Sequence, residues 1–274
     1  MAILTDTFTL NNGVKIPKIG FGTWQIPEGA EAYESVTTAL ELGYRHIDTA
    51  LQYGNEASVG KAIRDSGIDR SEIYLTTKLP AHIKTYEGAF EAFQTSMNNL
   101  DLEYIDLYLI HAPWPWTEIG ADYRKENAEV WKALEEIYAT GEVKAIGVSN
   151  FVVSDLEHLF KTATIIPAVN QIRYFIGNTQ DDTVKLSKEK GILVQGYSPL
   201  ATGAILDNPK LKEIADTYGK SIAQLSIRFI LQNDVLPLPK STNESRIKEN
   251  ADVDFVISDE DMTYLNSLDD ILKR

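Results

Sequence analysis

Short apolar runs of strand length alternate along the chain with longer stretches in which apolar residues recur every three or four positions. The short runs are typical of buried strands, and the longer stretches are typical of amphipathic helices. We predict eight strands, at residues 19–21, 44–47, 73–76, 105–110, 145–148, 168–170, 193–197 and 235–238. Such regular alternation indicates βα units that build a parallel sheet.

The predicted helix boundaries agree with this reading. Glycines that can adopt a left-handed C-terminal cap stand before three of the strands, at Gly43, Gly141 and Gly191. Helix starts are predicted from two capping boxes, Ser154 with Glu157 and Ser221 with Gln224, and from Pro209 after Asn208.

Ahead of the first strand, residues 7–16 carry Asn12-Gly13 between two apolar segments. This is the sequence signal of a β-hairpin, which could close the bottom of a barrel. No linker or low-complexity tract divides the chain, so we predict one domain over residues 1–274. The expected fold is an α/β, (β/α)8 TIM barrel with an N-terminal β-hairpin.

Polar residues follow almost every predicted strand. In barrels of this kind the catalytic groups gather at the carboxyl ends of the strands. The groups expected at that rim are Asp48, Lys78, His111, Ser149, Asn150, Gln171, Tyr197, Ser198 and Lys240. Each has a structural explanation when taken alone: an aspartate often caps a turn, and a single lysine often extends along a barrel rim to solvent.

As a set with Tyr53, these groups suggest an acid catalyst. A tyrosine is a poor acid at neutral pH unless a nearby cation stabilises its phenolate, and Lys78 can supply that cation. Asp48 can keep Lys78 charged in a dry pocket. His111 can orient a carbonyl oxygen by hydrogen bonding. Together they would protonate an oxygen while another agent delivers electrons to the carbon.

Composition limits the possible ligands. Lys and Arg number 26 against 40 Asp and Glu, a net charge of −14 that disfavours nucleic acid and anionic membranes as partners. Any anionic ligand needs a local basic cluster. The chain has no cysteine, which excludes disulfides and thiolate chemistry. We read no signal peptide and no apolar run long enough for a membrane helix, and expect a cytoplasmic protein.

Motifs of other enzyme classes are missing. No G-x-G-x-x-G follows a strand, and the glycines of 54–61 do not fit a phosphate-binding loop. The four histidines have no metal-ligand spacing, so we expect no metal.

Seven segments resemble motifs of the aldo-keto reductases, particularly the bacterial members, and occur in the family's order. They are GFGTW (20–24), GYRHIDTA (43–50), YGNE (53–56), TK (77–78), GVSNF (147–151), YSPL (197–200) and LPKSTNESRIKEN (238–250). The resemblance implies NADPH-dependent reduction of aldehydes and ketones to alcohols. It also implies a catalytic tetrad of Asp48, Tyr53, Lys78 and His111, in which Tyr53 protonates the oxygen.

The same resemblance implies an extended site for NADPH/NADP+. Ser149, Asn150 and Gln171 would bind the nicotinamide carboxamide and Tyr197 would stack on the ring. Lys240, Ser241 and Arg246 would bind the 2′-phosphate, with Asn250 near the adenine. The remaining expected cofactor contacts are Gly22, Thr23, Trp24, Ser198, Leu200 and Thr242.

Departures from the family pattern concern the substrate pocket, for which we predict Trp24 and Trp114. Many relatives have a tryptophan where this chain has Leu79-Pro80, and another directly after the tetrad histidine, where this chain has Ala112. Arg173 stands where relatives often carry a glutamate. The identity of the small carbonyl substrate stays open, and Trp116 is assigned equally to pocket, core or surface.

Two other functions remain possible at this point. Lys78 could form a Schiff base, as in barrel aldolases, or the barrel could be a non-catalytic NADPH sensor. We expect a monomer in each case.

Overall fold

The computed structural model describes residues 2–269 and 271–272. Eight parallel strands form one sheet in the order β10-β9-β8-β7-β6-β5-β4-β3, so that sequence neighbours are neighbours in space. The strands are β3 Phe21–Gly22, β4 His46–Asp48, β5 Tyr74–Leu79, β6 Leu107–Ile110, β7 Ile146–Ser149, β8 Val169–Arg173, β9 Leu193–Tyr197 and β10 Leu236–Leu238.

Backbone hydrogen bonds also join the two edges of this sheet. The amide of Gly20 donates to Pro237 O (3.1 Å) and that of Gly22 to Pro239 O (2.9 Å). A Cβ at Gly20 would lie 2.5 Å from a methyl of Leu238, so only glycine allows the first and last strands to approach this closely. The sheet is therefore a nearly closed barrel, which confirms the predicted fold class.

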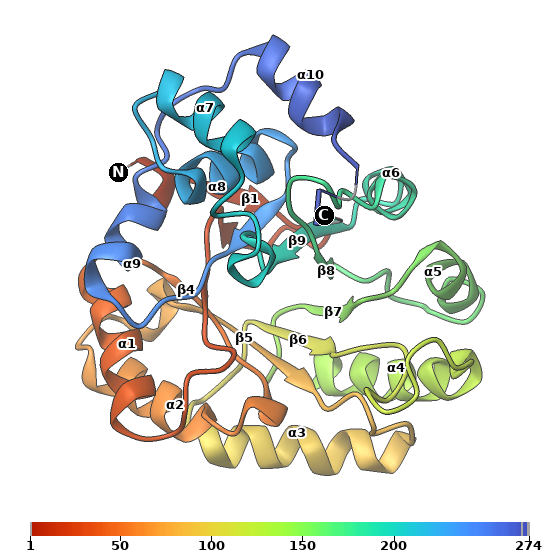
Figure 1. The fold of residues 1–274 in the computed structure, drawn as a ribbon. Coiled ribbons are helices and arrows are strands. Elements are labelled where there is room, and N and C mark those ends of the chain that lie inside the picture. Colours follow the sequence, from red (N-terminus) through yellow and green to blue (C-terminus); the bar gives the residue numbers. More distant parts are fainter. Residues whose placement is uncertain (1, 270, 273–274) are drawn as a thin grey trace.

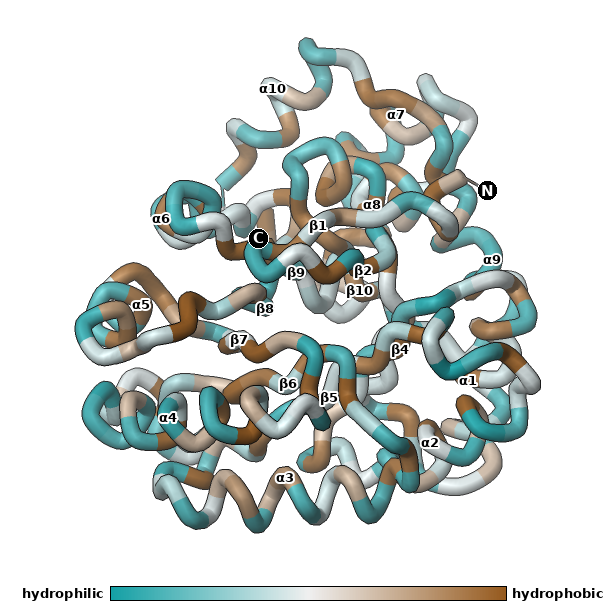
Figure 2. The backbone as a smooth tube through the Cα atoms, turned by 180° about the vertical axis from the view of Figure 1, so that it is seen from behind, coloured by the Kyte–Doolittle hydropathy of each residue, from teal (hydrophilic) through white to brown (hydrophobic). Residues whose placement is uncertain are grey.

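Helices surround the strands (Figure 1). They are α1 Ala30–Glu41, α2 Glu56–Asp65, α3 Tyr86–Leu100, α4 Arg124–Thr140, α5 Val153–Leu159, α6 Asp181–Glu189, α7 Pro209–Thr217, α8 Ile222–Gln232, α9 Glu244–Ala251 and α10 Asp259–Ser267. Short 3-10 turns occupy Ala2–Leu4, Leu51–Tyr53, Arg70–Glu72 and Ala201–Gly203. Hydrophobic and hydrophilic positions alternate along the helices, as expected when one face packs on the barrel (Figure 2). Within the described residues, no helix is long and apolar enough to cross a membrane.

The predicted hairpin is present as β1 (Thr7–Thr9) and β2 (Lys15–Pro17), which pair antiparallel. Its apolar side chains Leu10 and Ile16 pack with inward-facing residues of β6 and β10. Asn12 Nδ2 donates to Lys144 O (3.0 Å), just before β7. The hairpin therefore fills the amino-terminal end of the barrel, opposite the rim where the polar residues were expected.

All eight predicted strands are present, and their observed ends lie within three residues of the predicted ones. Strand β3 begins two residues later than expected because its pairing with β4 is confined to two residues. Strand β5 runs on to Leu79, so Lys78 lies inside a strand rather than after it. The Ser221–Gln224 capping box, the Pro209 start and the glycines at three helix ends are confirmed. The Ser154–Glu157 box is wrong: α5 is capped from Val152, and Asp155 accepts the Val152 amide.

Candidate active site

A cavity of about 860 Å³ opens at the carboxyl ends of the barrel strands. Its volume lies in the range of cofactor and small-molecule sites. Twelve of the residues predicted from the sequence line it: Gly22, Trp24, Asp48, Tyr53, His111, Ser149, Asn150, Gln171, Tyr197, Ser198, Leu200 and Lys240. Lys78 and Thr23 are fully enclosed directly behind the wall.

The loop after β4 places Tyr53 on this wall. Its turn ends at Gly54, in a left-handed conformation (φ 71°) that suits glycine. The next residue, Asn55, is buried and donates to the carbonyls of Thr23 (3.0 Å) and Ile26 (2.9 Å). These bonds tie the Tyr53 loop to the segment after β3, so the phenol is held by two neighbouring βα loops.

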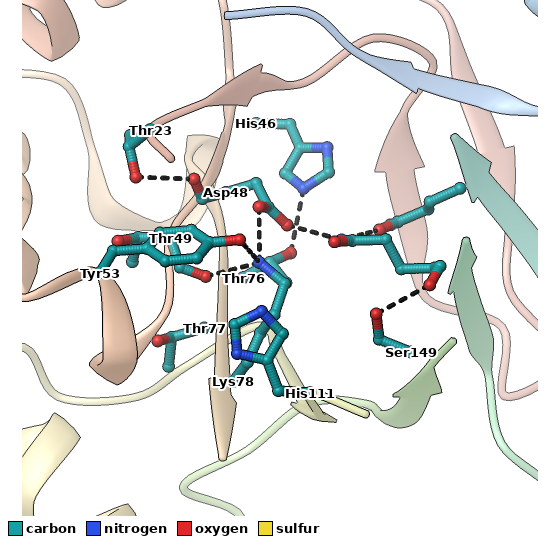
Figure 3. Close-up of polar contacts among 12 residues, drawn as sticks. Thr23, His46, Asp48, Thr49, Tyr53, Thr76, Thr77, Lys78, His111 and Ser149 are labelled. Carbon is teal, nitrogen blue, oxygen red and sulfur yellow. Dashed lines mark hydrogen bonds and ion pairs between the residues drawn. The ribbon is translucent and has the colours of Figure 1, made fainter. Parts of the chain in front are cut away.

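Lys78 links the carboxylate to the phenol. Its Nζ donates to Asp48 Oδ1 (2.6 Å), to Thr49 O (2.8 Å) and to the Tyr53 hydroxyl (3.3 Å), as Figure 3 shows. The lysine is 0% exposed and Asp48 is 4% exposed. A buried ammonium is stable only when paired and hydrogen-bonded, and Asp48 with Thr49 provides that pairing.

The electrostatics differ from the sequence expectation in one respect. Burial lowers the pKa of Lys78, and the Asp48 carboxylate opposes this, as expected. The pKa of Tyr53 is raised well above its ordinary value by burial and then by the Asp48 charge. The cation therefore does not make the phenol more acidic before a ligand binds. Tyr53 is held in its protonated form, the form that can donate a proton.

His111 lies against the same phenol. The rings of Tyr53 and His111 meet edge to face, with centroids 5.5 Å apart. Burial and then the charge of Lys78 lower the pKa of His111 well below its ordinary value, so the imidazole is neutral. Nδ1 is enclosed and has no hydrogen-bond partner among the described residues. Since the ring lines the cavity, its other nitrogen is the one available to a ligand.

A row of amides continues from the tetrad across the barrel. Gln171 Nε2 donates to Asp48 Oδ2 (2.7 Å) and to Gln195 Oε1 (2.9 Å). Both glutamines are buried, so these bonds fix the orientation of the Gln171 amide. Gln195 was not predicted as a site residue, because a residue of β9 cannot be matched to its partner on β8 before the strand register is known.

Three further predicted cofactor residues are bonded to one another. Tyr197 donates to Asn150 Oδ1 (2.8 Å), and Asn150 Nδ2 donates to Ser149 Oγ (3.1 Å) and to His111 O (3.1 Å). Asn150 and Ser198 also have positive φ values, 61° and 51°. Non-glycine residues in this conformation carry backbone strain, which is commonest at ligand sites.

Two cations were predicted to bind the phosphate of the cofactor. Lys240 lines the cavity, whereas Arg246 lies off the cavity wall, in the first turn of α9, whose N-terminus is capped by Asn243. Neither side chain forms an ion pair with any residue in 2–269 or 271–272. The alternative pairing of Arg246 with Glu244 or Glu249 is thus not present. Ser241, Thr242 and Asn250 follow in the same segment but lie off the cavity wall.

The aromatic pocket wall differs from the prediction. Trp24, which is 47% exposed, lines the cavity as expected. Trp116 lines it too, whereas Trp114 lies behind and packs edge to face on Trp116, with centroids 5.2 Å apart. Trp116 also meets His111 edge to face at 5.6 Å. The loop that follows His111 doubles back, which a single sequence does not indicate.

Lys84 and Asn127 hold that loop and account for part of the departure at Ala112. Lys84 Nζ donates to Ala112 O (2.8 Å) and to Asn127 Oδ1 (2.8 Å). Asn127 Nδ2 in turn donates to Pro113 O (2.8 Å). Burial lowers the pKa of Lys84 to about 8. The backbone of the loop after His111 is therefore fixed by a partly buried ammonium and an amide.

No group of three or more His, Asp or Glu side chains in the described part of the chain could hold a metal ion. A nicotinamide cofactor, in contrast, fits the observed donors. The amides and hydroxyls of Ser149, Asn150 and Gln171 border one region of the cavity, and the free cation of Lys240 borders another.

Comparison with known proteins agrees with this geometry. The model of the Aldo/keto reductase family matches residues 18–270. The glyoxal reductase of Bacillus subtilis is 45% identical over 266 residues, which are 97% of this chain and 93% of that protein. A solved aldo/keto reductase from Brucella melitensis is 42% identical with a TM-score of 0.90, covering 96% of this chain and 99% of that one.

A second solved structure, the Bombyx mori aldo-keto reductase in complex with NADP, is 34% identical with a TM-score of 0.85. It covers 95% of this chain and 92% of its own. With the barrel, the position of the cavity and a family match over nearly the whole length, the chain belongs to the aldo/keto reductase family.

Proposed function

We propose that this protein reduces a small aldehyde or ketone with NADPH, and that Tyr53 donates the proton to the carbonyl oxygen. One observation carries the assignment of the acid. Tyr53 lines the cavity, and its hydroxyl oxygen lies 3.3 Å from Nζ of Lys78, which forms an ion pair with Asp48. When bound, the reduced nicotinamide supplies the hydride to the carbonyl carbon.

The side chains of this site donate the proton and stabilise the negative charge that develops in the reaction. The neutral imidazole of His111 donates a hydrogen bond that holds the carbonyl oxygen beside Tyr53. As the phenol gives up its proton, the negative charge forms on an oxygen next to Lys78, which stabilises it. Asp48 keeps Lys78 charged and in place. Trp24 and Trp116 cover the site with apolar surface that excludes water.

The cofactor would lie along the cavity from the amides to the cations. Ser149, Asn150 and Gln171 would hold the carboxamide, with Tyr197 beside the ring. Lys240 and Arg246 supply two unpaired positive charges for a 2′-phosphate in a protein whose net charge is −14. This local charge supports a preference for NADPH over NADH.

A Schiff-base lyase is not favoured. Lys78 is fully enclosed, and its Nζ has three oxygen partners within 3.3 Å. An amine nucleophile needs a free lone pair and access to the substrate carbonyl. Lys78 meets neither condition in this arrangement.

The test is Tyr53→Phe, which keeps the ring and removes the hydroxyl. We expect NADPH-dependent turnover of an aldehyde to fall at least ~100-fold, because a positioned acid contributes that much or more. The affinity for NADPH, measured by fluorescence titration, should change by less than about twofold. Tyr264→Phe removes an exposed hydroxyl and should behave as the parent protein. Near-parental turnover of Tyr53→Phe would exclude Tyr53 as the acid. A parent protein that binds NADPH but reduces no aldehyde or ketone would instead favour the sensor alternative.

We further propose that the chain acts as one catalytic domain and as a monomer in the cytoplasm. The absence of cysteine suits a reducing compartment. Light scattering of the purified protein should give the mass of one chain, and a mass of two chains would reject the monomer.

A further inference from the structure

Arg173 lines the cavity as Lys240 does, but it has no role in the proton or cofactor chemistry described above. It is the last residue of β8, opposite Tyr197 in the parallel register, and it lines the cavity. Side chains two residues apart on a strand share a face, so Arg173 lies on the face of Gln171, about 7 Å farther toward the mouth. Because Gln171 contacts Asp48, Arg173 stands over the reacting end of the cavity.

The backbone of Arg173 is held in place, and its exposed side chain lies beside an aromatic ring. Its carbonyl accepts hydrogen bonds from Asn178 Nδ2 (2.8 Å) and Gln180 Nε2 (2.7 Å). The guanidinium carbon lies 5.1 Å from the centre of the Phe175 ring. The end of β8 thus fixes where the side chain of Arg173 starts, at the mouth of the cavity.

The guanidinium is nevertheless not neutralised. No acidic side chain among the described residues forms an ion pair with it. Burial raises the pKa of Tyr197 to about 12, and the nearby charge of Arg173 opposes that rise. The positive charge of Arg173 therefore acts on Tyr197, a residue of the cavity wall. In a protein with 40 acidic residues, a guanidinium that lines the cavity and has no ion pair within residues 2–269 and 271–272 is a specific feature of this site.

We propose that Arg173 binds a carboxylate on the carbonyl substrate, so that the enzyme prefers aldehydes or ketones that also carry an anionic group. This inference rests on the proposed function, because it concerns the substrate of the same site. The planar fork of an arginine matches a carboxylate with two parallel hydrogen bonds. The phosphates of the cofactor are already provided with Lys240 and Arg246 in another part of the site.

The experiment compares two aldehydes of the same shape, 4-carboxybenzaldehyde and the uncharged 4-formylbenzamide. The measured quantity is the ratio of their kcat/KM values with saturating NADPH. In Arg173→Met we expect this ratio to fall at least about tenfold, which corresponds to about 1.4 kcal/mol. Arg173→Lys, which keeps the charge, should retain most of the ratio, and Arg173→Glu should lower it further than Arg173→Met. Arg124→Met, a change outside the cavity, should leave it unchanged.

Binding provides a readout that does not need turnover. Benzoate and benzamide are titrated into the NADPH-bound protein, and tryptophan fluorescence is recorded, since Trp24 and Trp116 line the cavity. The Kd for benzoate should rise at least about tenfold in Arg173→Met, with a much smaller change for benzamide. A protein that binds benzoate through Arg173 but oxidises no NADPH would contradict the proposed function and not this inference.

Two results would overturn the role of Arg173. The first is an unchanged preference for the charged aldehyde together with an unchanged Kd for benzoate. The second is an unchanged preference with a higher KM for both NADPH and NADH, which would show that Arg173 contacts a phosphate of the cofactor instead.

Discussion

Arg246 is the residue whose side chain we expect to distinguish NADPH from NADH most directly. Its backbone amide is used by the Asn243 cap, while its guanidinium is exposed and forms no ion pair with the described residues. We expect Arg246→Ala to raise KM for NADPH at least about tenfold, because a charge-assisted bidentate contact to phosphate is lost. KM for NADH, which has no 2′-phosphate, should change by less than about twofold.

Steady-state kinetics with both cofactors measure this difference. Lys248→Ala changes an exposed cation on the same helix and serves as the control. Equal losses for NADPH and NADH would show that Arg246 does not bind the 2′-phosphate.

At the scale of elements, Gly60 determines how closely α2 packs on α3. A Cβ on Gly60 would lie 2.0 Å from Leu100 O, at the carboxyl end of α3. Helix α2 directly follows the loop of Tyr53, so this contact also supports the wall of the site. A backbone carbonyl cannot move aside as a side-chain tip can, and the helices must separate to admit a methyl group.

Gly60→Ala should therefore lower the free energy of unfolding by about 2 kcal/mol, within the range measured for overpacking. Helix propensity alone would predict the opposite, a gain of up to ~1 kcal/mol. Urea denaturation shows whether the free energy of unfolding falls or rises in Gly60→Ala. Lys61→Ala, an exposed position of the same helix, should change stability by less than about 0.5 kcal/mol. A Gly60→Ala protein as stable as the parent would show that α2 and α3 accommodate the extra methyl group at no cost in stability.

At the scale of the whole molecule, buried histidines make stability depend on pH. His46 is 0% exposed inside the barrel, and burial with the charge of Lys78 lowers its pKa to about 3. An unfolded histidine titrates near ~6.5. Between these values the unfolded chain binds a proton that the folded chain does not, so the free energy of unfolding falls as the pH falls from about 6.5 toward 3.

We predict that His46→Gln, which can keep a hydrogen bond to Thr76, reduces this dependence. Between pH 7 and pH 5 the variant should lose about 2 kcal/mol less than the parent protein in urea unfolding. His82→Gln, at an exposed position, should leave the dependence unchanged. Parallel pH profiles for the parent and His46→Gln would mean that His46 is protonated in the folded state.

The sequence by itself determined the order and type of the elements. Every βα unit carries its own apolar period, and several also carry a glycine at the helix end or a capping residue at the helix start; these signals act over a few residues. The wrong element boundaries arise where contacts beyond the local sequence decide where a strand ends or a helix starts. Strand β5 continues through Lys78 because pairing with β6, and not hydrophobicity alone, sets its end. Helix α5 starts at Val153 because Asp155, and not Ser154, reaches the free amide.

Only the tertiary structure decided which side chains meet. Tyr53 and Lys78, or Asp48 and Gln171, lie 25 and 123 residues apart in the chain. Their distances depend on barrel closure and strand register, and both of these result from contacts along the whole molecule. The sequence named the tetrad residues through motifs, but it could not show that burial raises the pKa of Tyr53. Nor could it show that Arg173 lines the cavity with no acidic partner among the described residues, since burial and pairing exist only once distant segments have packed together.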